Sequence, residues 1–472
     1  MKKIAPYYSS GFERNQQECF ISGLDVQGKI PDWLNGQLVR NGPGLVDLPG
    51  QRLNHWFDGL AALHGFSIRN GKVDYLCRFL ESASYHAARE GKKLTYSEFA
   101  TDPCKSIFKK VQSYVVPSPP NMTDNPKVSL AKIGDKYFAL GETPMMIEFD
   151  PATLATLSSQ ELIPGGFAYK TTAHPHFDQG KAYNLVVKFG MFSHYRIHEL
   201  ANPQKPLAST VVRNPAYLHG FGITPNYFIV AAGPFTAVPL QLLYWHRPYV
   251  ENHTWNPEKG AHIYIFERST GKLKVRFETE AFFAFHHVNA WEEGEEIVMD
   301  LDAYDDADII QSYYRDELAD PAKEFPIGTI RRFRMNLRTK KVACEVRSSA
   351  CIELPRIDYD RYNMSSDYRH VYGVSIHPDH RKGFYNAIVK INPEKGTSDY
   401  WYEAGTHPGE PFFMPSPGSK KDDQGVLMSI VLDAKKNNSF LLVLRAEDLS
   451  ELARVLVPEP ILYGFHTEFF AS

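Results

Sequence analysis

The sequence lacks a long apolar run, paired cysteines and an excess of charge. No stretch approaches the about 18 apolar residues of a membrane-spanning helix, and no apolar segment follows Lys2 and Lys3 to form a secretory signal. The five cysteines are odd in number and scattered, which argues against a disulfide framework or a thiolate zinc site. A net charge of −3 creates no field that would gather nucleic acid. We therefore expect a cytoplasmic protein without a nucleic-acid partner, associated at most with a membrane surface.

Aromatic side chains, by contrast, are abundant. Phe occurs 30 times and Tyr 26 times. Most of these rings must belong to the hydrophobic core, but the surplus is compatible with the lining of a site for a long apolar ligand.

One pattern recurs along the chain: a short alternating strand, a polar turn and a second strand. Successive turns lie 82, 52, 65, 69, 56 and 53 residues apart, and seven residues mark them: Gly71, Thr153, Lys205, Thr270, Thr339, Lys395 and Asp448. Four-stranded blades that close radially would bury most sheet edges, so the repeat predicts an all-β, seven-bladed β-propeller, with residues 1–472 as one domain. Two β-sandwiches are the alternative, although no Gly-, Ser- or Pro-rich linker marks a boundary between them.

The longest step between two turns contains an insertion around residues 81–127. Within it, "DPCKSIFKKVQSYVVPSPP" interleaves apolar side chains with three lysines, and helical spacing would gather the apolar ones on one face. A basic amphipathic segment is typical of a membrane-surface contact, which here would involve Cys104, Ile107, Phe108 and Val111. A helix packed on the propeller explains the same pattern equally well.

Four of the 18 histidines begin a strand or lie in apolar surroundings: His174, His219, His286 and His466. They are 45, 67 and 180 residues apart, too far for a helical metal motif. In a propeller, however, strands of different blades converge on the central axis, where distant residues can meet. Four neutral imidazoles suit a first-row metal such as iron, zinc or copper. At any single one of these positions, a structural histidine is the simpler interpretation.

Sequence motifs spread along nearly the whole chain resemble those of one family. They are "VRNGPG" (39–44), "HWFDGLAALHGF" (55–66), "SEFAT" with "DPCKSIF" (97–108), "GETPMMIEFDPATL" (141–154), "AHPHFD" (173–178), "HGFGIT" (219–224), "FHHVNAWEE" (285–293), "IELPRIDY" (352–359), "GEPFFMPSPG" (409–418), "DDQGVLMSIV" (422–431) and the final "GFH". The chain resembles the carotenoid cleavage oxygenases, especially the branch of the animal β-carotene oxygenases and the vertebrate retinoid isomerohydrolase.

The resemblance implies a seven-bladed propeller with a helical and loop cap over an axial ferrous iron, Fe(2+). By motif position, the ligands would be the four histidines named above. His176 and His287, the second members of their pairs, would not be ligands. The family also has three glutamates that hold ligand imidazoles, and by position Glu142, Glu353 and Glu410 would pair with His219, His286 and His466, respectively. The family often has Gly after the last ligand, where this chain has Thr467.

The resemblance also implies an apolar tunnel that leads to the iron. Phe57 and Phe99 match positions whose rings line the tunnel in the isomerohydrolase branch, where an aromatic face could stabilise a cationic polyene. Core packing is the alternative for both rings.

The function that follows is a non-haem iron dioxygenase that cleaves a conjugated C=C bond of a carotenoid or apocarotenoid with O2, giving aldehyde or ketone products such as retinal. The lipophilic polyene and O2 would be its partners, together with a peripheral membrane contact. Retinyl-ester isomerohydrolysis and stilbene cleavage are alternatives on the same scaffold. A non-catalytic propeller that binds apolar ligands is a third, which the full set of histidines and glutamates disfavours.

Overall fold

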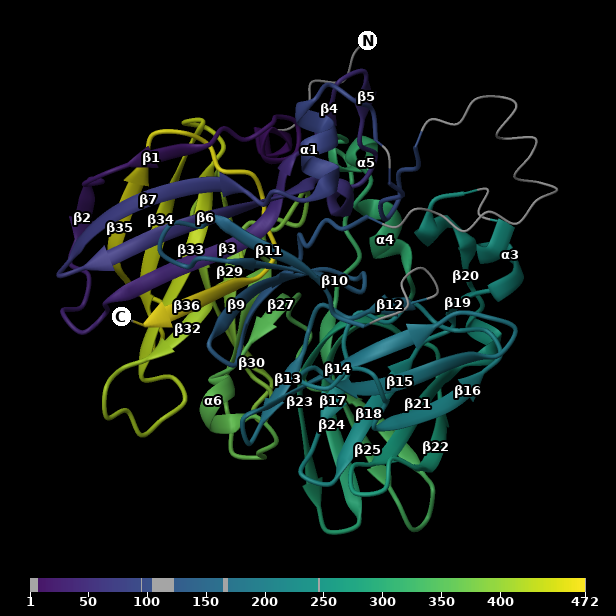
Figure 1. Cartoon of the computed structure of the whole chain (residues 1–472). Coiled ribbons are helices and arrows are strands. Elements are labelled where there is room, and N and C mark those ends of the chain that lie inside the picture. The colour runs from purple at the N-terminus through teal and green to yellow at the C-terminus, as the bar shows by residue number, and fades with distance from the viewer. Residues whose placement is uncertain (1–6, 95, 104–122, 164–168, 245–246, 472) are drawn as a thin grey trace.

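The computed structural model describes residues 7–94, 96–103, 123–163, 169–244 and 247–471, and strands dominate them (Figure 1). Within these ranges, seven sheets of four or more antiparallel strands form the blades of a propeller. The predicted all-β, seven-bladed architecture is therefore confirmed.

The first three blades, each given from one edge strand to the other, have the following strands. The first contains β1 (Cys19–Ile21), β7 (Lys72–Phe79), β6 (Leu60–Arg69), β3 (Gly36–Leu45) and β36 (Thr467–Ala471). The second contains β11 (Thr156–Glu161), β10 (Met145–Phe149), β9 (Lys136–Leu140) and β8 (Ser129–Ile133). The third contains β12 (Tyr169–Thr171), β14 (Lys181–Lys188), β15 (Ser193–Glu199) and β16 (Ala208–Val212), with β13 (His176–Asp178) also paired to β14.

The remaining four blades follow in chain order. The fourth contains β17 (Gly222–Ile223), β18 (Tyr227–Ala232), β21 (Ala261–Glu267) and β22 (Leu273–Thr279), and the fifth β23 (Phe283–Glu293), β24 (Glu296–Tyr304), β25 (Thr329–Asn336) and β26 (Val342–Val346). The sixth contains β27 (Glu353–Arg356), β28 (Val371–Ser375), β29 (Ala387–Asn392) and β30 (Thr397–Tyr402). The seventh contains β31 (Thr406–Pro408), β32 (Phe412–Pro415), β33 (Gly425–Asp433), β34 (Asn438–Arg445), β35 (Glu451–Val457) and β2 (Val26–Gly28).

Two strand exchanges between the first and the last blade close the ring. β36 pairs with β3 in the first blade, while β2 pairs with β35 in the seventh. Each of these blades thus contains a strand from the other end of the chain, which satisfies edge hydrogen bonds that would otherwise be open. Apolar side chains of β6 and β34, such as Phe66 and Leu441, pack in one buried cluster between the two blades.

All seven predicted hairpins are adjacent strand pairs within blades. The one between β6 and β7 shows why the sequence specifies them: Arg69 pairs with Lys72, so the loop is only Asn70 and Gly71. Both loop residues have positive φ, +50° and +75°, which Asn and Gly tolerate best. Such a turn fixes the register of the two strands.

Short helices and two small sheets accompany the blades. α1 (Ala83–Arg89), α3 (Pro239–Tyr244), α4 (Asp308–Ser312) and α5 (Arg315–Leu318) lie toward one side of the sheets, and α6 (Tyr359–Tyr362) lies apart from them (Figure 1). The small sheets pair β4 (Asp47–Leu48) with β5 (Gln51–Arg52), and β19 (Phe235–Ala237) with β20 (His253–Trp255). Among the described residues, no helix is both long and apolar enough to cross a membrane. The predicted membrane contacts Cys104, Ile107, Phe108 and Val111 fall outside the described residues.

Candidate metal centre and cavity

Four blades contribute one histidine each to a single cluster of side chains. His174 lies between β12 and β13, His219 just before β17, His286 within β23 and His466 just before β36. The imidazole nitrogens of the four side chains lie within 4.8 Å of one another. Nε2 of His174 is 3.0 Å from Nε2 of His219, and Nε2 of His286 is 3.3 Å from Nε2 of His466. The structure thus brings together the four residues that the sequence analysis singled out.

A bulge in β23 positions His286. The pairing of β23 with β24 shifts register between Ala284 and His287, so His286 falls outside the regular ladder. A bulge bends its strand and redirects a side chain, which strict alternation would not allow. His286 therefore joins the cluster, while its neighbour His287 stays in the ladder opposite Leu301.

Each expected glutamate contacts the imidazole predicted for it. Oε1 of Glu142 is 2.6 Å from Nδ1 of His219, and Oε1 of Glu410 is 2.8 Å from Nδ1 of His466. Oε2 of Glu353 is 2.9 Å from Nδ1 of His286. A carboxylate at Nδ1 holds the proton on that nitrogen and leaves the lone pair of Nε2 free to bind a metal.

Glu410 has a second partner that sequence reasoning missed. Nε and Nη2 of Arg356 donate to its two oxygens at 2.9 and 3.2 Å, and the Thr467 amide donates at 2.6 Å. Burial works to raise the pKa of Glu410, but the charge of Arg356 and the hydrogen bond from His466 lower it to about 2. Arg356 stands in the "IELPRIDY" motif, and its position four residues after Ile352 gave no sign that it faces the centre.

Two further hydrogen bonds fix the other glutamates. The hydroxyl of Tyr217 donates to Oε1 of Glu142 at 2.6 Å. The amide of Leu354 donates to Oε2 of Glu353 at 2.6 Å, and Leu354 has φ of +51°, a left-handed conformation that is uncommon for a leucine. The strained residue lets the backbone turn toward the carboxylate beside it.

The second histidines of the two pairs lie outside the cluster. Both nitrogens of His176 are engaged, Nδ1 with the hydroxyl of Tyr359 at 2.8 Å and Nε2 with the carbonyl of Phe221 at 2.7 Å. His176 therefore has no nitrogen free for a metal.

The donor set fits a divalent first-row metal. Burial, together with the three neighbouring imidazoles, lowers the pKa of His174 well below its ordinary value, and burial lowers that of His466 to about 4. His174 and His466 are therefore neutral donors at pH 7. Of the three carboxylates, Glu410 forms an ion pair with Arg356, whereas Glu142 and Glu353 have no lysine or arginine of the described residues within ion-pair distance, so their charge can help to balance a dication.

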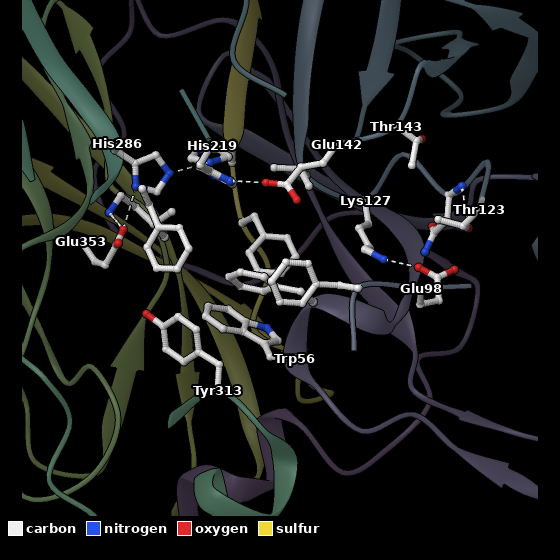
Figure 2. Close-up of a pocket in the computed structure, with 18 of the residues that line it drawn as sticks. Trp56, Glu98, Thr123, Lys127, Glu142, Thr143, His219, His286, Tyr313 and Glu353 are labelled. Carbon is white, nitrogen blue, oxygen red and sulfur yellow. Dashed lines mark hydrogen bonds and ion pairs between the residues drawn. The ribbon is translucent and has the colours of Figure 1, made fainter. Parts of the chain in front are cut away.

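A cavity reaches this centre, and aromatic rings form much of its wall (Figure 2). His219, His286 and His466 line it, as do Phe57 and Phe99, whose ring centroids are 5.2 Å apart. Both rings also belong to or pack against the largest aromatic core cluster, so they serve the core and the cavity together. The other rings of the wall are Trp56, Phe285, Tyr313, Tyr385 and Phe465.

Comparison with known proteins gives consistent matches over the whole chain. The family model described as retinal pigment epithelial membrane protein matches residues 12–471. A carotenoid isomerooxygenase of Galleria mellonella is 33% identical over 99% of this chain and 98% of its own length. The human beta,beta-carotene 15,15'-dioxygenase is 33% identical over 98% of this chain and 94% of its own length.

Solved structures agree. The crystal structure of cobalt-substituted Synechocystis apocarotenoid oxygenase superposes with a TM-score of 0.87 at 26% identity, covering 99% of this chain and 98% of that one. The chain therefore belongs to the retinal pigment epithelial membrane protein and carotenoid oxygenase family.

Proposed function

We propose that the protein is a non-haem iron dioxygenase that cleaves a conjugated C=C bond of a carotenoid or apocarotenoid with O2, giving two carbonyl products. The observation that carries the proposal is one arrangement: four imidazoles supported by three carboxylates at the wall of an aromatic cavity. Relatives at 33% identity bear the names carotenoid isomerooxygenase and beta,beta-carotene 15,15'-dioxygenase.

The residues of the chain prepare the site in three ways. Glu142, Glu353 and Glu410 fix the tautomers of three imidazoles, so that their Nε2 atoms point to one place. Rings such as Phe57 and Phe285 line the cavity, where they would keep water out and would stabilise positive charge that develops on the polyene. Bound iron would supply the binding and activation of O2, and His174, His219, His286 and His466 would hold it.

Exposed apolar residues support a peripheral membrane contact as part of this function. Met191 is 87% exposed, Phe192 67% and Leu240 62%. Phe189 and Leu242, beside these residues in sequence, pack on the same core cluster. A membrane surface would deliver a lipophilic substrate to the protein.

The proposal is tested by product analysis with iron-loaded protein. β-Carotene, an apocarotenal, a retinyl ester and a hydroxystilbene are incubated separately in air, with His286→Ala as the inactive control. Aldehydes from a polyene that are absent with the variant are the expected result. Retinol from the ester, or aldehydes from the stilbene alone, would replace the proposal by isomerohydrolysis or stilbene cleavage. Binding without turnover would favour a ligand-binding propeller.

A further inference from the structure

One part of the cavity wall is polar. Glu98, Lys127, Thr123 and Thr143 line it together with Lys170. In Figure 2, Glu98, Lys127, Thr123 and Thr143 lie on the opposite side of the view from His286 and Glu353, with aromatic rings between. A tunnel built only for a hydrocarbon has no need of buried charges, because each would lose its water without gaining a partner.

Glu98 and Lys127 form an ion pair that leaves one acceptor unused. The side chains are 0% and 8% exposed, and Nζ of Lys127 donates to Oε2 of Glu98. Oε1 of Glu98 accepts no hydrogen bond from the described residues. The Thr123 hydroxyl is the nearby donor: burial raises the pKa of Glu98 and the interaction with this hydroxyl lowers it, but the hydroxyl makes no hydrogen bond of normal geometry to Oε1 and also contacts Oγ of Ser84 at 3.2 Å.

Lys170 is the complementary unused donor. Its Nζ lies 4.2 Å from the centroid of the Tyr249 ring, and no described carboxylate lies within ion-pair distance of it. Glu142, the acid whose charge acts most strongly on it, already accepts hydrogen bonds from His219 and Tyr217. Burial lowers the pKa of Lys170 to about 8, so the ammonium is largely charged at pH 7.

We propose that the wall formed by Glu98, Lys127 and Lys170 binds a hydroxyl group at one end of the polyene substrate. The hydroxyl donates to Oε1 of Glu98 and accepts from the ammonium of Lys170, so both unused groups gain a partner. The inference rests on the proposed function, because the polyene then extends along the aromatic wall toward the four histidines.

Other end groups satisfy this wall less well. A carbonyl oxygen accepts from Lys170 but leaves Oε1 of Glu98 without a donor. A carboxylate would meet the charge of Glu98 at short range. A hydrocarbon end leaves Oε1 of Glu98 buried and unpaired and gives the half-buried ammonium of Lys170 no partner, and sites built to hydrogen-bond a hydroxyl discriminate strongly against analogues that lack it.

The test compares an apocarotenol, the matching apocarotenal, β-carotene and a hydroxystilbene with the iron-loaded protein. Two readouts are taken: kcat/KM in air, and Kd without O2 from the change in polyene absorption or, for the stilbene, in its fluorescence. The variants are Glu98→Gln, which keeps an acceptor for Lys127 but turns an amide N–H toward the cavity, and Lys170→Met, which breaks no ion pair among the described residues. Lys181→Met, on the exposed end of β14, is the matched control.

The wild type should bind the alcohol at least about tenfold more tightly than β-carotene, which corresponds to about 1.4 kcal/mol, because the hydrocarbon leaves a buried group unpaired. Glu98→Gln should reverse the preference between alcohol and aldehyde, Lys170→Met should weaken binding of the alcohol about tenfold, and Lys181→Met should change nothing. Equal affinities for alcohol and hydrocarbon, or a folded Lys170→Met with unchanged affinity for the alcohol, would overturn the inference. Selective binding of the alcohol without cleavage would support the hydroxyl-binding role of this wall and overturn the proposed dioxygenase activity. If the hydroxystilbene binds best and loses affinity in both variants, the hydroxyl site is supported but the assignment of a polyene as the substrate is overturned.

Discussion

Replacing Glu410 by glutamine should damage the metal centre and the fold together. The carboxylate of Glu410 accepts hydrogen bonds from His466, from Arg356 through two nitrogens, and from the Thr467 amide. Glutamine keeps the shape but removes the charge, and its NH2 group must face one of these donors. His466 loses its fixed orientation, and Arg356 loses its principal counter-charge.

The loss of stability in Glu410→Gln depends on the interactions that Arg356 keeps. Removing one partner of a buried ion pair costs roughly 3–5 kcal/mol when the other charge is left alone. Arg356 keeps Glu468 at 3.0 Å, so we expect a smaller loss of about 2 kcal/mol in the unfolding free energy of the metal-free protein. Metal affinity should fall about 10- to 100-fold, as for other residues that orient a ligand. For Glu142→Gln we expect the same loss of affinity but only about 1 kcal/mol of stability, because its partners are His219 and Tyr217.

Urea unfolding of the metal-free proteins and competition for ferrous iron against a chelator measure the two quantities separately. Glu403→Gln is the control, since Glu403 pairs with Arg454 at the surface and its loss should cost less than about 1 kcal/mol. Equal unfolding free energies for Glu410→Gln and Glu142→Gln would refute the role given to Arg356. Unchanged iron affinity in both would refute the support given to the imidazoles.

Three further predictions concern the metal, the pH and the backbone. Adding ferrous iron to the metal-free protein should raise its melting temperature, because binding adds about 2.7 kcal/mol to the free energy of unfolding when the free iron concentration is one hundred times Kd. His286→Ala should abolish the shift, and a shift retained by the variant would place the metal elsewhere. Burial lowers the pKa of His407 to about 4 from 6.5, so its neutral form stabilises the fold fully above about pH 6.5 and this contribution is lost as the pH falls toward 4. The free energy of unfolding falls between pH 7 and pH 5, and this fall should be about 2 kcal/mol smaller in a folded His407→Gln variant than in the wild type. An equal fall in both proteins would contradict this reasoning. In Gly42→Ala the new Cβ would lie 2.4 Å from the Cα of Gly464, two residues before His466, so the free energy of unfolding should fall by about 1–3 kcal/mol. Gly190→Ala, with nothing nearer than 3.8 Å, should change stability little.

The hairpins were predictable because local chemistry specifies them. Turns such as Asn70-Gly71 and the alternation around them act within a few residues, so a single sequence contains the signal. The strands near the axis carry no such signal. β17 is only two residues long, and β27 contains a register shift with Leu354 at positive φ, features that depend on neighbouring blades.

The candidate site divides in the same way. The alternation in "HPH" places His174 and His176 on one face of a strand. The two differ because Nδ1 of His176 is hydrogen-bonded to the hydroxyl of Tyr359, which lies 183 residues away in sequence. Strand context singled out His174 as a candidate, but the resemblance to a family was needed to exclude His176 as a ligand. Lys127 in "NPKVSL" resembles an exposed residue next to a strand, because nothing near it in sequence shows that it pairs with Glu98, 29 residues earlier.

The measurement that tests the central claim most directly is the fate of molecular oxygen. Iron-loaded protein is incubated under ¹⁸O₂ with a polyene that it converts, and both products are analysed by mass spectrometry with a correction for exchange with water. The dioxygenase predicts two carbonyl products that each contain ¹⁸O and that are absent without O2. Unlabelled products, or conversion that continues without O2, would contradict it.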